Sequence, residues 1–535
     1  MQAKNIIFGG EIYKGIARGA DCLANAVKTT LGPKGRYVVV AHGIDAPLIT
    51  KDGATVARHI ELVDKLENVG AQAIKEVALR MEELVGDGTT TATVIAQAIL
   101  QKGMRYLAVG INPRDLIRGI NLAVAAAVEE LHRTSLPCNT TEDIHRIATI
   151  SANGDRVIGD LLAEAIRHVG KDGVVEIEES ESGKDELFIS KGISFDHGFS
   201  SPRYSGHEFS HSIKFEEAYI CLAEQLSNPE ALLPLLEQVR RTGFPLLVIA
   251  GEIADSVLSF LSTIHTSGAL QVCAVKTPAL KGAQRDLYED IAVFTGAKVI
   301  SNDLDISMRE VTLAHLGKAK KIVIDNKKSS VIGGYGDRPL IHTHVKSLQM
   351  QLAAAKSTEL RSLLRNRIAK LVCGIAVIKI GGSTKTAIQE KKWRATDALQ
   401  SVRGAMAEGY VVGGGVALMR TQDAVEIVKA NSLDIDAGID VVLQALTAPL
   451  CQIAINSGAE PLVVSAKVRQ NTGSYGYNAA TDEYGDLAAM GVLDATVIVR
   501  TALQQAASVS CLVLTTDCVV AVSYTHLRAH ETRED

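Results

Sequence analysis

Apolar residues in the first 136 positions recur mainly at helical spacing. Ile16, Ala20, Leu23 and Val27 fall three or four residues apart, as on one face of an amphipathic helix. The run Leu31-Gly-Pro-Lys-Gly35 should end that helix, because glycine and proline break helical geometry. The spacing predicts helices over 10–31, about 54–84, 89–107 and 113–133, and short strands at 36–40 and around 48–50. We therefore expect this part of the chain to be mostly helical.

The pattern changes after Pro137. A helical span is predicted near 142–168, and Gly173-Val-Val-Glu-Ile-Glu178 alternates as in a half-buried strand. Between 186 and 336, strands at Leu246–Ala250, Val272–Val275, Val299–Ile300 and Ile322–Ile324 alternate with helices at 230–241, 253–267 and 284–294. A helical pair at about 339–371 and a strand at Ile375–Ile380 follow, and helical spacing returns from 386. This order predicts an α/β module inserted into one helical domain.

Composition narrows the class of protein. A length of 535 residues predicts three or four domains, and 47% hydrophobic with 22% charged residues is typical of a soluble globular protein. The net charge of −5, without a long basic run, argues against nucleic acid as a partner. Eight scattered cysteines without a C-x-x-C pattern favour a reducing compartment. With no signal peptide and no run of 18 apolar residues, we expect a cytoplasmic protein that does not enter a membrane.

The most distinctive stretch for chemistry is Val85-Gly-Asp-Gly-Thr-Thr-Thr-Ala-Thr93. Glycine lets a backbone pass close to a ligand, and the first turn of a helix offers free N–H groups to an anion. Three threonines in a row are poor helix formers, so helix propensity does not explain them. Asp87 would be repelled by phosphate but could hold the magnesium that accompanies a nucleotide. The alternative is that Asp87 is an ordinary N-cap and that the threonines bond back to their own helix.

Several motifs identify a family. They are Thr29-Thr-Leu-Gly-Pro-Lys-Gly-Arg36, Ile49-Thr-Lys-Asp-Gly53, Gly86-Asp-Gly-Thr-Thr-Thr-Ala-Thr93, Ile150-Ser-Ala-Asn153, Gly413-Gly-Gly415 and Tyr475-Gly-Tyr-Asn-Ala-Ala480. On these motifs the chain resembles the group I chaperonins of the bacterial GroEL type, nearly end to end, as a divergent member. No G-x-x-x-x-G-K-[ST] sequence occurs, so the nucleotide site is not a P-loop.

The resemblance implies a multidomain fold of α and α/β type. A mostly helical equatorial ATPase domain would comprise 1–136 and 409–520, and a small intermediate hinge domain would comprise 137–190 and 375–408. An inserted α/β apical domain would occupy 191–374. Pro137, Gly192, Gly374 and Gly409 match the family's hinge positions, although ordinary turn chemistry explains each of them equally well. The polar end, 521–535, lacks the family's Gly/Met-rich tail, and we interpret it as non-native sequence.

The resemblance also assigns a nucleotide site for ATP and Mg2+, with K+ as a further candidate cation. Asp87 would ligate magnesium, and Lys51 would neutralise phosphate charge. Asp52 and Asp397 would be the catalytic acids that orient water. Because Asp397 belongs to the intermediate domain, hydrolysis would be coupled to a hinge motion. The other residues implied to bind ATP are Thr30, Leu31, Gly32, Pro33, Gly88, Thr89, Thr90, Thr91, Gly414, Asn478, Ala479, Ala480 and Asp494.

In the apical segment the family exposes an apolar strip that binds unfolded chains and a lid. Phe199, Tyr204, Leu233, Leu236 and Leu258 keep this apolar character, although a leucine on a helix is a core residue by default. At three further positions the chain is polar where the family usually has an aromatic and two aliphatic residues, namely Arg203, Ser262 and Thr263. Substrate range or lid affinity is therefore expected to differ.

The family's partners would be non-native proteins and a GroES-type co-chaperonin lid. The chain would self-associate into rings, heptameric by resemblance and either single or double. His197 and Lys385 cannot form the family's arginine–glutamate pair between subunits, and Cys451 stands where an arginine faces the acid matched by Glu460. These departures support an alternative, a divergent paralogue that acts as a binding or scaffold protein with reduced lid-dependent folding. A metabolic kinase or ATPase is disfavoured because no acceptor site is evident.

Overall fold

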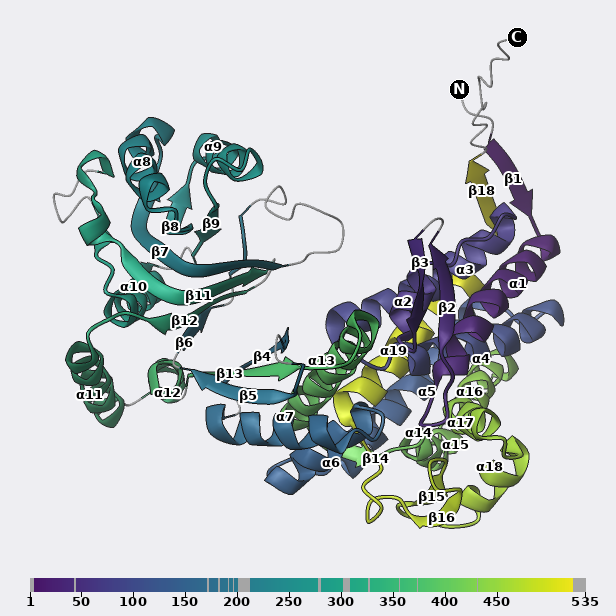
Figure 1. Cartoon of the computed structure of the whole chain (residues 1–535). Helices are drawn as coiled ribbons and strands as arrows, with labels where there is room; N and C mark the ends of the chain where they lie inside the picture. The colour runs from purple at the N-terminus through teal and green to yellow at the C-terminus, as the bar shows by residue number, and fades with distance from the viewer. Residues whose placement is uncertain are drawn as a thin grey trace, which may run out of the picture. The chain divides into compact units, whose positions relative to one another are not determined.

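The computed structural model describes residues 4–42, 45–170, 173–180, 183–190, 192–195, 197–200, 212–277, 281–301, 308–325, 328–355, 357–372, 374–430 and 432–522 (Figure 1). The chain divides into two compact units. The first unit combines Met1–Ala163, Glu179–Asp185 and Ile380–Asp535, and the second combines Glu164–Glu178 with Glu186–Lys379. The α/β module is thus inserted into a mostly helical unit. The finer division into equatorial, intermediate and apical domains stays a prediction.

The first unit contains the two ends of the chain. Its N-terminal elements are β1 Lys4–Phe8, α1 Gly10–Val27, β2 Val38–His42, β3 Asp45–Thr50, α2 Gly53–Arg58, α3 Lys65–Leu84, α4 Thr89–Ala108, α5 Pro113–Thr134, α6 Thr141–Ser151 and the start of α7 Arg156–Val169. Its C-terminal elements are α13 Lys385–Glu408, β14 Tyr410–Val412, α14 Val416–Arg420, α15 Gln422–Glu426, α16 Leu433–Ala445, α17 Ala448–Ser457, α18 Pro461–Arg469, β15 Tyr475–Asn478, β16 Glu483–Asp486, β17 Leu493–Ala495, α19 Thr496–Leu514 and β18 Cys518–Val522.

The second unit follows the alternating pattern of its sequence. Its strands are β4 Val174–Glu179, β5 Glu186–Ser190, β6 Gly192–Phe195, β7 Ser212–Leu226, β8 Leu246–Ile253, β9 Val272–Lys276, β10 Val299–Ile300, β11 Gly317–Asp325, β12 Ser329–Gly334 and β13 Ile375–Ile380. Its helices are α8 Leu233–Thr242, α9 Asp255–Thr266, α10 Lys281–Thr295, α11 Arg338–Ala354 and α12 Thr358–Val372.

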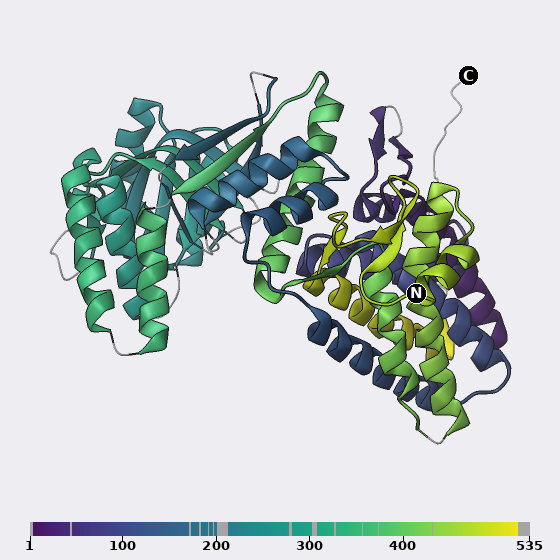
Figure 2. The same ribbon diagram turned by 90° about the horizontal axis from the view of Figure 1, so that it is seen from below.

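The two chain ends pack together in the first unit. Figures 1 and 2 show the purple and blue N-terminal helices beside the yellow C-terminal helix α19. Helix α19 packs against α3, α4 and α5, and α16 packs against α5. Strand β18 pairs antiparallel with β1, so that Ala521 and Val522 lie opposite Asn5 and Lys4. The first two residues of the segment interpreted as non-native thus belong to a strand, and 523–535 lie outside the described residues.

Two spans that the spacing predicts as single helices are each interrupted. Between α2 and α3, the Asp64 carboxylate caps α3 by accepting hydrogen bonds from the backbone of Leu66 and Glu67, both at 2.9 Å. Between α6 and α7, Asn153 and Gly154 adopt φ values of 57° and 85°. A side-chain cap and a left-handed turn each end a helix even where the apolar spacing continues.

The second unit is built on a seven-stranded mixed sheet. The strand order is β6-β12-β11-β7-β8-β9, and β10 pairs with β7 outside this path. Strands β8 and β9 run parallel to β7, whereas β11 is antiparallel to it. Strand β7 lies near the centre and buries Ala218 through Ala223, and this part of its sequence is a continuous apolar run. In Figure 1, helices α8 and α9 lie beside β8 and β9.

Two helical segments of the described chain are long and apolar enough to cross a membrane by length and composition. They are Leu433–Ser457 and Thr496–Leu514, and 56% and 67% of their most apolar windows are buried inside the protein. Helices α16 and α19 within these segments pack against other helices of the first unit. Core burial therefore explains their apolar character.

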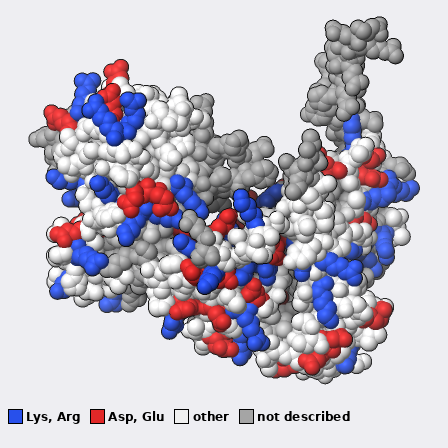
Figure 3. Space-filling view, viewed as in Figure 1, with Lys and Arg blue, Asp and Glu red and all other residues white. Residues whose placement is uncertain are grey.

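On the face shown in Figure 3, basic and acidic side chains are interspersed.

Candidate nucleotide site

A pocket of about 350 Å³ in the first unit gathers residues from separate parts of the chain. Its lining comes from the loop after α1, the start of α2, the start of α4, the end of α6, helices α13 and α17, and the segments 412–418 and 477–499. Every residue that the resemblance assigned to ATP, magnesium or catalysis lies in this lining. The structure thus brings together Thr30, Leu31, Gly32, Pro33, Lys51, Asp52, Asp87, Gly88, Thr89, Thr90, Thr91, Asp397, Gly414, Asn478, Ala479, Ala480 and Asp494.

The first turn of α4 forms one wall of the pocket. Gly88, not Asp87, is the N-cap of this helix, and it has a φ of 79°. Glycine has no side chain that could accept hydrogen bonds from the first turn of the helix. The backbone N–H groups of that turn, together with the positive end of the helix dipole, are therefore available to the pocket. The alternative in which Asp87 is an ordinary N-cap is therefore wrong. The threonine alternative holds for Thr93, whose hydroxyl donates to the Thr89 carbonyl at 2.9 Å.

Close packing explains why glycine occupies this turn. A Cβ atom at Gly88 would lie 2.5 Å from Cγ2 of Ile498. Its positive φ is also a conformation that other residues adopt only with strain. Glycine at this position therefore lets the backbone turn sharply and pack directly against α19.

The loop after α1 is held against the α4 turn. The hydroxyls of Thr30 and Thr90 lie 3.3 Å apart, and Thr30 also donates to the Val27 carbonyl at 2.9 Å. Asn456 on α17 donates from its side-chain amide to the carbonyls of Lys28 at 2.8 Å and Leu31 at 2.9 Å. No pattern in the sequence indicates this role for Asn456. The loop is therefore held from two sides, by the α4 turn and by α17.

Asp52 is fixed by its position at the start of α2. Its two carboxylate oxygens accept hydrogen bonds from the backbone of Ala54 at 3.1 Å and Thr55 at 2.8 Å. Asp52 is therefore the N-cap of α2 and also lines the pocket. Lys51 lies next to it, with Nζ 4.8 Å from the centre of the Tyr37 ring. This is the range of a cation–π contact.

The charge of the pocket is strongly acidic. Among its described lining residues, Asp52, Asp87, Asp397 and Asp494 are acidic and Lys51 is the single lysine or arginine. Burial raises the pKa of Asp87, hydrogen bonds from Ser401 and the Gly88 backbone partly oppose this rise, and the charge of Asp52 adds to it. Carboxylates gathered in this way repel each other.

The pKa values of Asp397 and Asp494 are raised as well. Burial, together with the charges of Asp87 and Asp52, raises the pKa of Asp397 well above the usual value for an aspartate. Burial and the charge of Asp87 raise the pKa of Asp494 to about 6. The repulsion is therefore shared across the pocket. A bound cation would relieve it, because opposite charge favours the ionised form.

This donor set fits magnesium bound together with phosphate. Among the described residues, no group of three or more histidine, cysteine or acidic side chains is arranged to hold a metal on its own. Magnesium typically takes one or two protein carboxylates and completes its coordination with water and substrate phosphates. Asp87, beside the uncapped turn of α4, suits this mode. The remaining acids would contribute negative charge to the same pocket.

Some lining residues were not assigned a role from the sequence. Asn153 and Gly154 reach the pocket because the chain turns between α6 and α7, and Ser401 reaches it from α13. The residues Asn153-Gly154-Asp155 are a recognisable turn signal that the continuing apolar spacing masked. Ser401 gave no signal, because a lone serine on a helix is usually a solvated residue.

The apical prediction needs two corrections. Leu236 is only 5% exposed and belongs to the core of the second unit, so it does not form part of an exposed strip. Ser262 is 1% exposed and donates to the Ser259 carbonyl at 3.0 Å, so its polarity does not alter the surface. Leu236 follows Leu232 and Leu235 and precedes Val239 on the buried stripe of this segment.

The remaining apical positions vary in exposure. Leu233 is 46% exposed, Thr263 is exposed, and Phe199 and Leu258 are partly buried against the core. Arg203 and Tyr204 lie outside the described residues. The polar change at this surface therefore rests on Thr263 among the residues that the structure describes.

One predicted hinge position has clear geometry. Gly409 has a φ of 84°, and a Cβ atom there would lie 2.4 Å from the Ser135 hydroxyl. Next to it, Leu136 and Tyr410 exchange two backbone hydrogen bonds of 2.8 Å. The two segments therefore pair here as an isolated antiparallel bridge, and they leave no room for a side chain at Gly409. This geometry requires glycine, whether or not the position acts as a hinge.

The fold matches that of a solved chaperonin. The crystal structure of the chaperonin gp146 from the bacteriophage EL 2 (Pseudomonas aeruginosa), in the presence of ATP-BeFx, superposes with a TM-score of 0.69 at 19% sequence identity. The match covers 96% of this chain and 98% of that chain. The expected combination of α and α/β parts is thus confirmed. The sequence also matches the model of the TCP-1/cpn60 chaperonin family over residues 23–523. Because that match spans nearly the whole chain, the protein belongs to the TCP-1/cpn60 chaperonin family.

Proposed function

We propose that this chaperonin hydrolyses ATP in the pocket of the first unit and uses the cycle to bind non-native proteins and promote their folding. The observation that carries the proposal is the convergence of four aspartates and the uncapped α4 turn in one pocket. These features come from segments that lie between residues 52 and 494 of the chain. Carboxylates that can hold a cation, next to N–H groups that can bind an anion, suit a nucleoside triphosphate with its cation better than an uncharged ligand.

The chain's own groups would bind the phosphates and the base at different ends of the pocket. The N–H groups at the start of α4 and the hydroxyls of Thr89, Thr90 and Thr91 would donate to phosphate oxygens, as at other helix N-termini. Magnesium, when bound at Asp87, would neutralise charge on the phosphates. Lys51 would add a positive charge at the same end. Asn478, Ala479, Ala480 and the neighbouring apolar side chains would enclose the base.

Asp397 would position the attacking water. Its raised pKa makes the carboxylate a better proton acceptor than an ordinary aspartate, as general base catalysis requires. It projects from α13, whereas the phosphate-binding groups come from α2, α4 and their loops. Turnover would therefore depend on how α13 sits against the rest of the pocket.

Charge balance supports a further cation in addition to magnesium. Magnesium-bound ATP still carries a net negative charge, and the described pocket lining has four aspartates against one lysine. A monovalent cation such as K+ would reduce the remaining repulsion. We therefore propose K+ as a second bound cation. ATP turnover in K+ compared with turnover in Na+ at equal ionic strength tests this.

The test of this catalytic proposal compares Asp397→Ala with the parent and with Thr396→Ala. Thr396 lies beside Asp397 on α13 but is exposed and bonds its own helix. We expect Asp397→Ala to lower ATP turnover by a hundredfold or more, the usual size of a general-base effect, while nucleotide binding persists. Thr396→Ala should behave as the parent. Equal turnover in all three proteins would refute the role of Asp397.

The chaperone part of the proposal concerns the second unit and its assembly. Leu233 offers exposed apolar surface on α8, and partly buried Leu258 and Phe199 lie on the same core. One such patch is small, and a ring of subunits would add patches and so raise avidity. We propose rings of seven subunits, single or double, with a co-chaperonin lid. Refolding of an aggregation-prone protein should improve with ATP and the lid; no gain over ATP-free controls would argue against a folding chamber.

A second candidate function is a binding or scaffold protein with reduced lid-dependent folding. Thr263 on α9 favours this candidate, because it is exposed and polar, and a lid held by apolar burial would lose part of its contact there. The two candidates differ in one measurement. A protein that hydrolyses ATP but fails to bind a lid in the presence of ATP fits the scaffold, and lid binding fits the folding chamber.

A further inference from the structure

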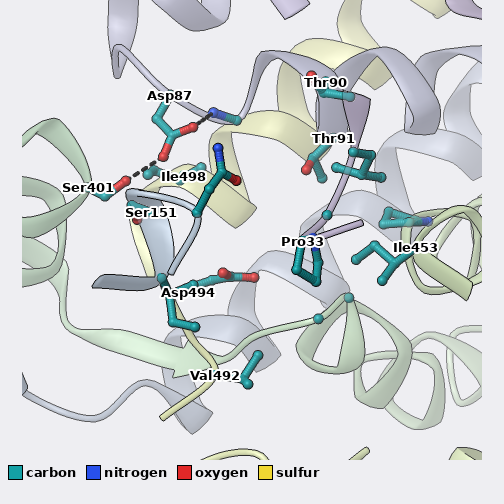
Figure 4. Close-up of a pocket in the computed structure, with 18 of the residues that line it drawn as sticks. Pro33, Asp87, Thr90, Thr91, Ser151, Ser401, Ile453, Val492, Asp494 and Ile498 are labelled. Atoms are coloured by element: carbon teal, nitrogen blue, oxygen red, sulfur yellow. Dashed lines mark hydrogen bonds between the residues drawn. The ribbon is translucent and has the colours of Figure 1, made fainter. Parts of the chain in front are cut away.

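Helix α13 carries a second polar side chain into the pocket, four residues after Asp397. Ser401 is 1% exposed, lines the pocket and donates a hydrogen bond to Oδ2 of Asp87 (Figure 4). The other oxygen of Asp87, Oδ1, accepts a hydrogen bond from the Gly88 backbone at 2.5 Å. The Asp87 carboxylate is therefore held by two donors, one from its own turn and one from α13.

A buried helical serine has an easier partner available. Serine and threonine within helices commonly donate to the carbonyl one turn earlier. Thr396 on the same helix does so, since its hydroxyl donates to the Lys392 carbonyl at 2.9 Å. The Ser401 hydroxyl instead reaches Asp87, which is 314 positions away in sequence. Its bond is thus between α13 and the magnesium-binding turn, and it is charge-assisted when Asp87 is ionised.

Backbone packing brings α13 to this turn. A Cβ atom at Gly86 would lie 2.7 Å from Cγ of Gln400, the residue before Ser401. Gly86 also has a φ of 78°, which other residues adopt only with strain. The turn around Asp87 therefore packs directly on the part of α13 that presents Ser401.

We propose that Ser401 is a positioning residue that orients the Asp87 carboxylate for magnesium, so that docking of α13 prepares the metal site and delivers Asp397 together. The inference rests on the proposed function of the pocket and adds a residue that acts through Asp87. Linkage makes the effect reciprocal: if docking of α13 favours magnesium, magnesium favours docking of α13 by the same factor.

The chain contains its own reporter for this coupling. Its single tryptophan, Trp393, lies on α13 four residues before Asp397 and is partly buried. Its fluorescence can be followed during a Mg2+ titration at a fixed, saturating concentration of a nonhydrolysable ATP analogue. Nucleotide retention measured by equilibrium dialysis in the same samples gives a second readout, and neither measurement depends on turnover.

The variants are Ser401→Ala, Ser401→Cys, Ser401→Thr and the control Thr396→Ala. Alanine removes the donor, and cysteine replaces it with a weak one of similar size. We expect both to raise the Mg2+ midpoint about tenfold, the equivalent of one charge-assisted hydrogen bond. Threonine keeps the hydroxyl and should stay within about twofold of the parent, as should Thr396→Ala. Circular dichroism checks that each variant is folded, and Ser401→Cys carries the test should alanine fail to fold.

The outcomes separate the two proposals. If the parent retains nucleotide with Mg2+ but Ser401→Ala and Ser401→Cys have the parent's midpoint, the role of Ser401 is overturned while the nucleotide site stands. If the parent itself retains no nucleotide at any Mg2+ concentration, the proposed function fails, and this inference fails with it. A raised midpoint in both variants, restored by threonine, supports the positioning role.

Discussion

The loss of folding stability that an ionised acid causes in this pocket can be calculated for Asp494. It lies in β17 and lines the pocket, and burial with the charge of Asp87 raises its pKa to about 6. An aspartate in an unfolded chain has a pKa of about 3.9. The folded protein therefore holds a proton more tightly than the unfolded chain does. Stability falls as pH rises from about 4 to about 6 and then levels off. At about 1.4 kcal/mol per unit, the loss is on the order of 3 kcal/mol.

Asp494→Asn should recover this loss. Without nucleotide, we expect the variant to gain on the order of 2–3 kcal/mol at pH 8 but only about 0.5 kcal/mol near pH 4, where the parent's carboxyl is protonated in the folded state and about half protonated in the unfolded chain. Thermal unfolding and urea unfolding between pH 4 and pH 8 provide the measurement, and the midpoint temperature should rise by a few degrees at pH 8. Glu61→Gln, at an exposed acid of the same unit, is the matched control.

Two results would refute the reasoning. A gain of equal size at pH 4 and pH 8 would mean that asparagine improves packing or hydrogen bonding, without a role for charge. No gain at pH 8 would mean that Asp494 is not under electrostatic strain. We also expect the stabilised variant to bind the nucleotide and its cation more weakly, since a strained site often trades stability for function.

Three further predictions concern other parts of the protein. Gly88→Ala should cost about 1–3 kcal/mol of stability through its positive φ, seen as a lower urea midpoint, and should weaken nucleotide binding. Tyr37→Leu should weaken nucleotide binding about two- to fivefold by freeing Lys51, whereas Tyr37→Phe keeps the ring and should bind as the parent in a calorimetric titration. Leu233→Ser should reduce capture of a denatured protein without changing the thermal midpoint, whereas Leu236→Ser should lower that midpoint because the side chain is buried.

Local chemistry made parts of the fold predictable. The helix expected at 89–107 is observed over Thr89–Ala108. It was predictable because a glycine-rich turn precedes it and its apolar spacing is regular. The interruptions between α2 and α3 and between α6 and α7 were missed. They depend on one capping side chain and one left-handed turn, whereas the prediction relied on apolar spacing. Strand β7 was missed because its middle, Ala218 through Ala223, is buried on both faces and does not alternate between apolar and polar residues.

Some residues of the site can likewise be predicted from the local sequence, and others cannot. Asp87 and the threonines that follow could be proposed from the residues alone, because anion binding at a glycine turn is a local property. Asp397 needed the resemblance, since nothing in its surrounding sequence separates it from a surface acid. The exposure of Leu236 was inferred from resemblance although its spacing with Leu232, Leu235 and Val239 marks a buried stripe. Ser401 depends on a contact between distant segments, which a single sequence does not reveal.

Contacts within the fold itself hold three of the four acids of the pocket in place. Asp52 is fixed by capping α2, Asp87 by two donors, and Asp494 by its place in β17, which pairs with β14. Oriented carboxylates repel each other at a cost in stability, and a cation with its nucleotide would remove that cost. Because Ser401 ties one of these acids to α13, relief of the repulsion is coupled to the helix that carries Asp397. Binding energy could therefore act on α13 through direct contacts alone.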